Sequence, residues 1–136
     1  MPVQDIQMFK QAAGEDYIIF NGPDEQFMSG RVIGAEGAIG GTYGAMPELF
    51  LKLDEHVKNG EIEKARELQH AINAIIYKMC SAHGNMYGVI KEILKRNENL
   101  ELGGVREPLP SLIDSDMPIV EEAARMICEA KEKYLA

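Results

Sequence analysis

The chain has 136 residues and a net charge of -8 at pH 7, with 46 % hydrophobic and 26 % charged residues. This composition is ordinary for a soluble globular protein, and the length allows one domain with a modest core. The negative charge argues against nucleic-acid and polybasic membrane surfaces, because both need clustered positive charge. No apolar run is long enough for a membrane span, and residues 1–5 have neither the basic flank nor the apolar core of a signal peptide.

The first part of the chain alternates helical and strand patterns. Residues 2–12 predict a short helix, and residues 17–20, Tyr-Ile-Ile-Phe, predict a strand that is covered on both faces. A helix is expected from Asp24 to about residue 33, and residues 38–40 form a second, very short strand candidate. Pro47 is expected to begin another helix that runs to about Lys58. This alternation is typical of βα units around a parallel sheet.

The rest of the chain has only helical patterns. A long helix is predicted over residues 61–81, with its apolar residues on one stripe, and a shorter helix over residues 86–95. Residues 97–115 are rich in glycine and proline and are expected to be irregular. A last helix is predicted from about residue 116, because acidic residues stand early in it and lysines late.

Two short strands leave a sheet with bare edges, which is physically incomplete. The strand over residues 17–20 in particular needs neighbours on both sides. We therefore expect either that another chain supplies the missing strands or that this chain associates with itself.

Polar residues directly follow the first predicted strand, in the order Asn-Gly-Pro-Asp-Glu over residues 21–25. In a parallel α/β protein, ligands bind at the carboxyl ends of the strands. Asp24 and Glu25 are therefore candidates to accept hydrogen bonds from a polyol. The alternative is that Asp24 caps the following helix and Glu25 is a first-turn acid that the helix dipole favours.

Five glycines, at positions 34, 37, 40, 41 and 44, surround the second predicted strand. A glycine-rich turn before a helix can let backbone N–H groups approach an anion. The chain lacks GxxxxGK[ST], and no GxGxxG follows a strand, so tight turns and close packing are the alternative explanation.

No metal site, cofactor or nucleophile is predicted. His56, His70 and His83 have no metal-ligand spacing, and Cys80 and Cys128 are expected to be reduced thiols in a cytoplasmic protein. The junction over residues 83–87 could reach a pocket or could be a plain turn. None of the nine lysines follows a predicted strand, and most lie among acidic residues, so none is expected to form a Schiff base.

The run over residues 17–44, YIIFNGPDEQFMSGRVIGAEGAIGGTYG, resembles the N-acetylneuraminate lyase branch of the dihydrodipicolinate synthase superfamily. The resemblance continues to the C-terminus and covers about the second half of a family member. It implies an α/β fold, a partial (β/α)8 barrel that contains the last two βα units plus a C-terminal helical extension, mostly α-helical by residue count. Residues 1–59 would be the partial barrel and residues 60–136 the extension, within one domain.

The resemblance also implies a reaction, the cleavage of N-acetylneuraminate to N-acetylmannosamine and pyruvate. In the family a lysine after the sixth strand forms the Schiff base, a tyrosine of the fourth strand assists, and a Gly-Ser/Thr-Thr turn binds the carboxylate. All three would lie upstream of Met1, so the chain alone is expected to be inactive and to hold no catalytic residue.

What the resemblance carries over is the part of the pocket that binds the polyol of a 2-keto sugar acid. Its residues would be Gly22, Asp24, Glu25, Gly40 and Gly41, and Tyr87 matches a position where the family often places an aromatic ring. At position 41 many members have a serine that hydrogen-bonds the sugar, and glycine removes that hydroxyl.

Two other interpretations stay open from the sequence. One is a non-catalytic half-barrel that survives as a homo-oligomer or as a subunit of a split enzyme, joined to a missing N-terminal half. The other is an aldolase of the same superfamily with a different substrate, such as aspartate semialdehyde.

Overall fold

Two short parallel strands and six α-helices make up residues 2–136, which the computed structural model describes. In the first part of the chain the elements are α1 (Val3–Ala13), β1 (Phe20–Asn21), a 3-10 turn (Asp24–Gln26), α2 (Phe27–Val32), β2 (Gly37–Ala38) and a second 3-10 turn (Thr42–Gly44). β1 and β2 pair in parallel, with Phe20 opposite Gly37 and Asn21 opposite Ala38. The predicted βα alternation is confirmed. Met1, where the predicted partial barrel begins, lies outside the described residues.

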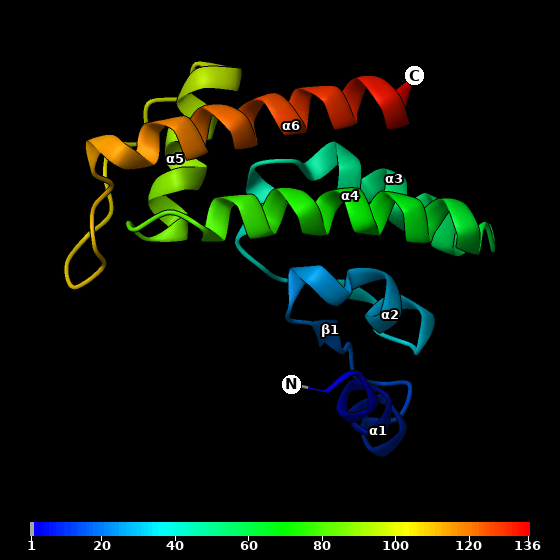
Figure 1. Cartoon of the computed structure of the whole chain (residues 1–136). Coiled ribbons are helices and arrows are strands. Elements are labelled where there is room, and N and C mark those ends of the chain that lie inside the picture. Colours follow the sequence, from blue (N-terminus) through cyan, green and yellow to red (C-terminus); the bar gives the residue numbers. More distant parts are fainter. Residues whose placement is uncertain (1) are drawn as a thin grey trace.

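Four helices follow: α3 (Pro47–Lys58), α4 (Ile62–Cys80), α5 (Met86–Glu98) and α6 (Met117–Leu135). Figure 1 shows α4 and α6 as long rods, with α3 and α5 packed against them. Their apolar stripes form one continuous core, whose fully buried members include Leu49, Leu68, Ile72, Ile76, Ile93 and Ile127. Because helical periodicity is pronounced in this part of the chain, the predicted helices agree with the structure to within three residues at each end.

Local sequence explains where these helices begin and end. α1 ends at Gly14, which has φ 78° and donates its N–H to the Lys10 carbonyl. α3 begins at Pro47, where a missing N–H costs nothing. Asn85 caps α5 by accepting a hydrogen bond from the Tyr87 N–H, and Asn99 ends α5 in the left-handed conformation.

The strands differ from the sequence prediction in position and in burial. β1 covers Phe20–Asn21 rather than residues 17–20, and β2 covers Gly37–Ala38 rather than residues 38–40. Tyr17 and Ile18 are 64 % and 67 % exposed, so the prediction of a strand covered on both faces is wrong for this chain. The reason is that β1 pairs only with β2, and no other strand among residues 2–136 lies beside it.

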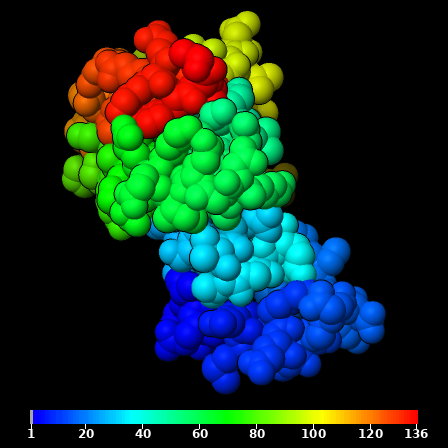
Figure 2. All heavy atoms as spheres, turned by 90° about the vertical axis from the view of Figure 1, so that its right-hand side faces the viewer, coloured from blue at the N-terminus to red at the C-terminus, as the bar shows by residue number. Residues whose placement is uncertain are grey.

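The strands and α1 form a separate end of the molecule. Figure 2 shows this N-terminal part projecting from the larger helical body. Large apolar side chains are exposed on it: Met8, Phe9, Tyr17, Ile18, Phe20 and Ile39. Among the described residues, no helix has the combination of length and apolar character that crossing a membrane requires.

Candidate functional site

A buried carboxylate joins the segments that follow the two strands. Because β1 and β2 are parallel, their carboxyl ends lie at the same edge. Asp24 Oδ2 accepts a hydrogen bond from the Thr42 N–H at 2.8 Å and one from the Thr42 hydroxyl at 2.6 Å. The structure therefore places Asp24 beside the segment after β2, where one of its carboxylate oxygens is bonded to Thr42.

Gly40 makes this contact possible. A Cβ at Gly40 would overlap Asp24 Oδ1 and lie 2.5 Å from Asp24 Cγ. The Asp24 side chain makes no capping bond to the following helix. Asp24 is thus a link between two strand ends rather than the helix cap that the sequence left as an alternative.

Glu25 lies beside Asp24 but is engaged differently. Its side chain is half-buried and enters no hydrogen bond or ion pair within residues 2–136. Its negative charge reaches Cys80 at the end of α4, where partial desolvation of the sulfur and, secondarily, Glu25 raise the pKa of the thiol. Glu25 is therefore less buried than Asp24, and both of its carboxylate oxygens are available for a ligand.

Tyr87 lies over Gly41 at the same edge. A Cβ at Gly41 would be 2.7 Å from Tyr87 Cε1 and 3.4 Å from the Tyr87 hydroxyl oxygen. The Tyr87 ring is 50 % exposed, so one face of it remains available. Tyr87, which the resemblance alone connected with the strand ends, therefore contacts Gly41 directly.

Gly22 is the predicted site residue that the structure does not bring into contact with the others. It is exposed in the turn after β1, and a Cβ there would meet nothing within 4 Å. Space around Gly22 is therefore open on the side where a side chain would stand.

A tyrosine hydroxyl is buried next to the two acidic residues. Burial, and secondarily the negative charge of Asp24, raise the pKa of Tyr43 well above its usual value, so its hydroxyl stays protonated. The Tyr43 hydroxyl and Asn21 Oδ1 are buried without a hydrogen-bond partner among the described residues. The strand edge thus has polar atoms that its own residues do not fully satisfy.

Two residues that the sequence analysis did not select also contact this edge. Gln69 and Asn73 of α4 donate hydrogen bonds to the backbone carbonyls of Asp24 and Glu25, at 3.3 Å and 3.1 Å. The sequence does contain one indication of this contact: Gln69 is a polar residue within the apolar stripe of α4, between Ala65 and Ile72. A polar residue at a buried stripe position needs a partner.

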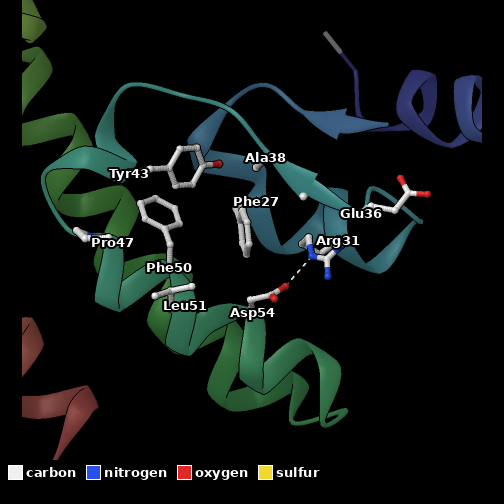
Figure 3. Close-up of a pocket in the computed structure, with 10 residues that line it drawn as sticks. Phe27, Arg31, Glu36, Ala38, Tyr43, Pro47, Phe50, Leu51 and Asp54 are labelled. Atoms are coloured by element: carbon white, nitrogen blue, oxygen red, sulfur yellow. Dashed lines mark hydrogen bonds and ion pairs between the residues drawn. The ribbon is translucent and has the colours of Figure 1, made fainter. Parts of the chain in front are cut away.

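A hollow of about 330 Å³ lies on the other side of Tyr43, between β2, α2 and α3. Figure 3 shows its aromatic wall of Phe27, Tyr43 and Phe50, with the Arg31–Asp54 ion pair at the other side. These two charges bind each other at 2.6 Å, and Glu36 is paired with Lys10. Since its charged groups are already paired, this hollow is a weaker ligand site than the strand edge.

The described lysines do not have the environment of a Schiff-base former. Where their pKa is shifted, it is raised: glutamate partners do this for Lys10, Lys95 and Lys133, whereas a nucleophilic lysine needs a lowered pKa. Within residues 2–136 no group of three or more His, Cys, Asp or Glu could hold a metal ion. Both cysteines are free and exposed.

Comparison with known proteins gives consistent matches. A sequence model of the Dihydrodipicolinate synthetase family matches residues 2–127. The N-acetylneuraminate lyase of Mediterraneibacter gnavus is 78 % identical over 135 residues, which are 99 % of this chain and 43 % of that protein. The chain therefore spans less than half the length of this curated relative.

Solved structures agree with this match. The sialic acid aldolase of Ruminococcus gnavus, solved as wild type and as a catalytic-lysine mutant, is 78 % identical with a TM-score of 0.97 over 98 % of this chain and 44 % of that chain. The N-acetylneuraminate lyase of Fusobacterium nucleatum is 29 % identical with a TM-score of 0.73 over 96 % of this chain and 41 % of that chain. A dihydrodipicolinate synthase of Bacillus anthracis, 18 % identical with a TM-score of 0.81, shares the fold.

Proposed function

Because the chain belongs to the dihydrodipicolinate synthetase family, we propose that it is the sugar-recognising part of an N-acetylneuraminate lyase. The observation that supports this proposal is the strand edge, where Asp24 contacts Gly40 and Thr42, and Tyr87 contacts Gly41. The 78 % identity to an N-acetylneuraminate lyase and to a sialic acid aldolase supports the choice of a sialic acid as substrate.

Each residue of the edge has a chemical role in this proposal. The Glu25 carboxylate accepts hydrogen bonds from hydroxyls of the polyol tail, because it has no partner of its own within residues 2–136. Asp24 holds the two strand ends at a fixed spacing through Thr42. The open space at Gly22 lets the backbone approach the sugar, and the half-exposed ring of Tyr87 lies against Gly41.

The chemistry itself needs groups that this chain does not supply. In a class I aldolase a lysine amine condenses with the keto group and releases water. The β-hydroxyl loses its proton, the C–C bond breaks with its electrons passing to the iminium, and the aldehyde product leaves. The enamine that remains takes up a proton on carbon, and hydrolysis then releases pyruvate and the lysine amine. We propose that the lysine belongs to the part of the barrel that precedes this chain in the family.

The part of the barrel that precedes this chain in the family would also cover the bare strand edges. Tyr17, Ile18 and Ile39 are exposed on the strand segments, which is the surface that adjacent strands cover in a closed barrel. The proposal therefore includes a partner segment that contributes strands. It also includes the cytoplasm as the place where the assembly acts.

Reconstitution tests the proposal directly. The chain alone is expected to release no pyruvate from N-acetylneuraminate. Coexpression with the part of the Mediterraneibacter gnavus lyase that it does not cover should restore release, and borohydride with pyruvate should label a lysine of that added part. Pyruvate release by the chain alone, or borohydride labelling of one of its own nine lysines, contradicts the proposal.

A matched pair of variants tests the role of Glu25. In the reconstituted assembly, Glu25→Gln should raise KM for N-acetylneuraminate about tenfold, since a charged acceptor contributes roughly 1.5–3 kcal/mol. Glu132→Gln makes the same chemical change on an exposed position of α6 and should leave KM unchanged. An equal effect of both variants would remove the reason for assigning Glu25 to the site.

The exposed apolar surface also favours a second candidate, self-association without catalysis. This candidate predicts a homo-oligomer whose formation buries Ile18 and Ile39. It also predicts that the oligomer neither traps pyruvate nor gains activity on coexpression. Light scattering of the purified chain, with an Ile18→Asp variant as control, separates this candidate from the lyase proposal.

A further inference from the structure

The helix α4 carries two side-chain amides in contact with the turn that holds Asp24 and Glu25. Gln69 is only 6 % exposed, and Asn73 lies one helical turn further along. The neighbouring stripe positions Leu68, Ile72 and Ile76 are buried and apolar. A buried amide among apolar residues is costly unless its polar atoms are bonded, so its bonds indicate why it is there.

Both polar atoms of Gln69 are engaged across the fold. Gln69 Oε1 accepts a hydrogen bond from the Met28 N–H at 2.8 Å. Gln69 Nε2 donates to the Asp24 carbonyl oxygen at 3.3 Å and to Asn73 Oδ1 at 2.8 Å. All donor and acceptor types of this side chain are therefore satisfied, and two of the three bonds go to the backbone near the strand edge.

Asn73 continues the same network. Its Oδ1 accepts from Gln69, and its Nδ2 donates to the Glu25 carbonyl oxygen at 3.1 Å. The two amides thus hold the carbonyls of Asp24 and Glu25 and the N–H of Met28, over a sequence separation of 41 to 48 residues. A three-residue 3-10 turn has few hydrogen bonds of its own, so this external support fixes its backbone.

We propose that Gln69 and Asn73 are positioning residues, which hold the Asp24–Glu25 turn in the orientation that recognises the polyol end of the substrate. The inference rests on the proposed function, because it names the residues behind that same site. α4 thereby has two roles: its apolar stripe builds the helical core, and its two amides set the geometry of a site at the strand edge.

The first experiment uses the chain alone and its amide hydrogen exchange. Gln69→Leu should accelerate exchange at the Met28 N–H on the order of tenfold, because its acceptor is lost. The matched control is Asn97→Leu, which removes a bond from an Asn Nδ2 to a backbone carbonyl, that of Ala124, far from the turn. Unchanged Met28 exchange in Gln69→Leu would overturn the proposed network.

The second experiment uses the reconstituted assembly and separates positioning from general destabilisation. Gln69→Leu and Asn73→Leu should raise KM for N-acetylneuraminate about tenfold and change kcat less than about threefold. Borohydride trapping of pyruvate should stay at the wild-type level, since pyruvate has no polyol. Asn97→Leu should change none of these quantities.

The outcomes distinguish this inference from the proposed function. A KM at the wild-type level in both Leu variants, in an active assembly, overturns the inference and leaves the lyase function standing. An assembly with the wild-type chain that releases no pyruvate overturns the proposed function. In that case the exchange at Met28 still decides whether the amides hold the turn.

Discussion

The two ends of the molecule are stabilised in different ways. In the helical region, residues 47–136, four helices bury one continuous apolar core. In the strand region, residues 2–46, many large apolar side chains face outward, and polar links such as Asp24 to Thr42 and Met28 to Gln69 hold the segments together. Phe27 and Met46 still join the helical core, so the difference lies in the strand segments, which leave side chains such as Ile18 and Ile39 uncovered within residues 2–136.

The same substitution placed in both regions gives the largest expected contrast. Ile72→Ala removes a fully buried side chain from α4 and should lower the free energy of unfolding by about 2–5 kcal/mol. Ile18→Ala, at a residue that is 67 % exposed, should change it by less than about 0.5 kcal/mol. Urea unfolding of both variants at low protein concentration measures the two values.

Concentration sharpens this contrast further. If the chain associates with itself through the strand region, Ile18→Ala becomes destabilising as concentration rises, because the side chain is then buried between copies. A large effect of Ile18→Ala at every concentration would break the comparison, since it would mean that Ile18 contributes to the core of the single chain.

A glycine pair tests whether the link between the strand ends is as tight as it is in the structure. Gly40→Ala places a Cβ on the buried Asp24 carboxylate and should cost about 1–3 kcal/mol. Gly44→Ala is its control, because Gly44 is exposed and a Cβ there meets nothing within 4 Å. Equal urea midpoints for the two variants would show that the Asp24 side chain moves aside at little cost.

The helical region has a comparable buried carboxylate, and its effect depends on pH. Asp116 accepts hydrogen bonds from the backbone N–H groups of His83, Ile113 and Gly84, which lower its pKa from 3.8 to about 2. Because the folded pKa is the lower one, the stabilisation is fully present above pH 4 and is lost as pH falls toward 2.

Asp116→Asn measures this contribution. The variant keeps one acceptor oxygen, so the loss at neutral pH should be smaller than that of Gly40→Ala. The difference in thermal midpoint from the wild type should shrink as pH falls from about 4 to about 2. A difference that stays constant over this range would mean that ionisation of Asp116 does not contribute to stability.

The helical region could be predicted from sequence because its pattern is local and repeated. The apolar stripe of α4 predicts the extent of that helix, and the proline at the start of α3 predicts where that helix begins. Both predictions need only residues of the helix itself. The strands could be predicted as elements, but their burial could not. The apolar run over residues 17–20 predicts neighbouring strands that would cover it, and no such strand lies beside it within residues 2–136.

The candidate site divides in the same way. Asp24 and Glu25 follow the first strand, so the rule for strand ends finds them, whereas Gly40 was assigned to the pocket through the family resemblance. Gln69 and Asn73 reach the same turn from more than 40 residues away, and only their polar character within an apolar helix face could have drawn attention to them. Contacts of this range follow from the packing of α4 and not from local pattern.

The smallest expected effect concerns Gly41 and Tyr87. It tests whether the Tyr87 ring can move relative to the strand edge. Gly41→Ala would place a Cβ 2.7 Å from Tyr87 Cε1, but the half-exposed ring can rotate away. The free energy of unfolding should therefore change by less than about 0.5 kcal/mol. The ring resonances of Tyr87 should nevertheless shift, and Tyr87→Ala should remove any cost of Gly41→Ala in a double-mutant cycle. A cost well above 0.5 kcal/mol that Tyr87→Ala relieves would show instead that the ring is fixed over Gly41, and that this edge is as rigid as the one between Gly40 and Asp24.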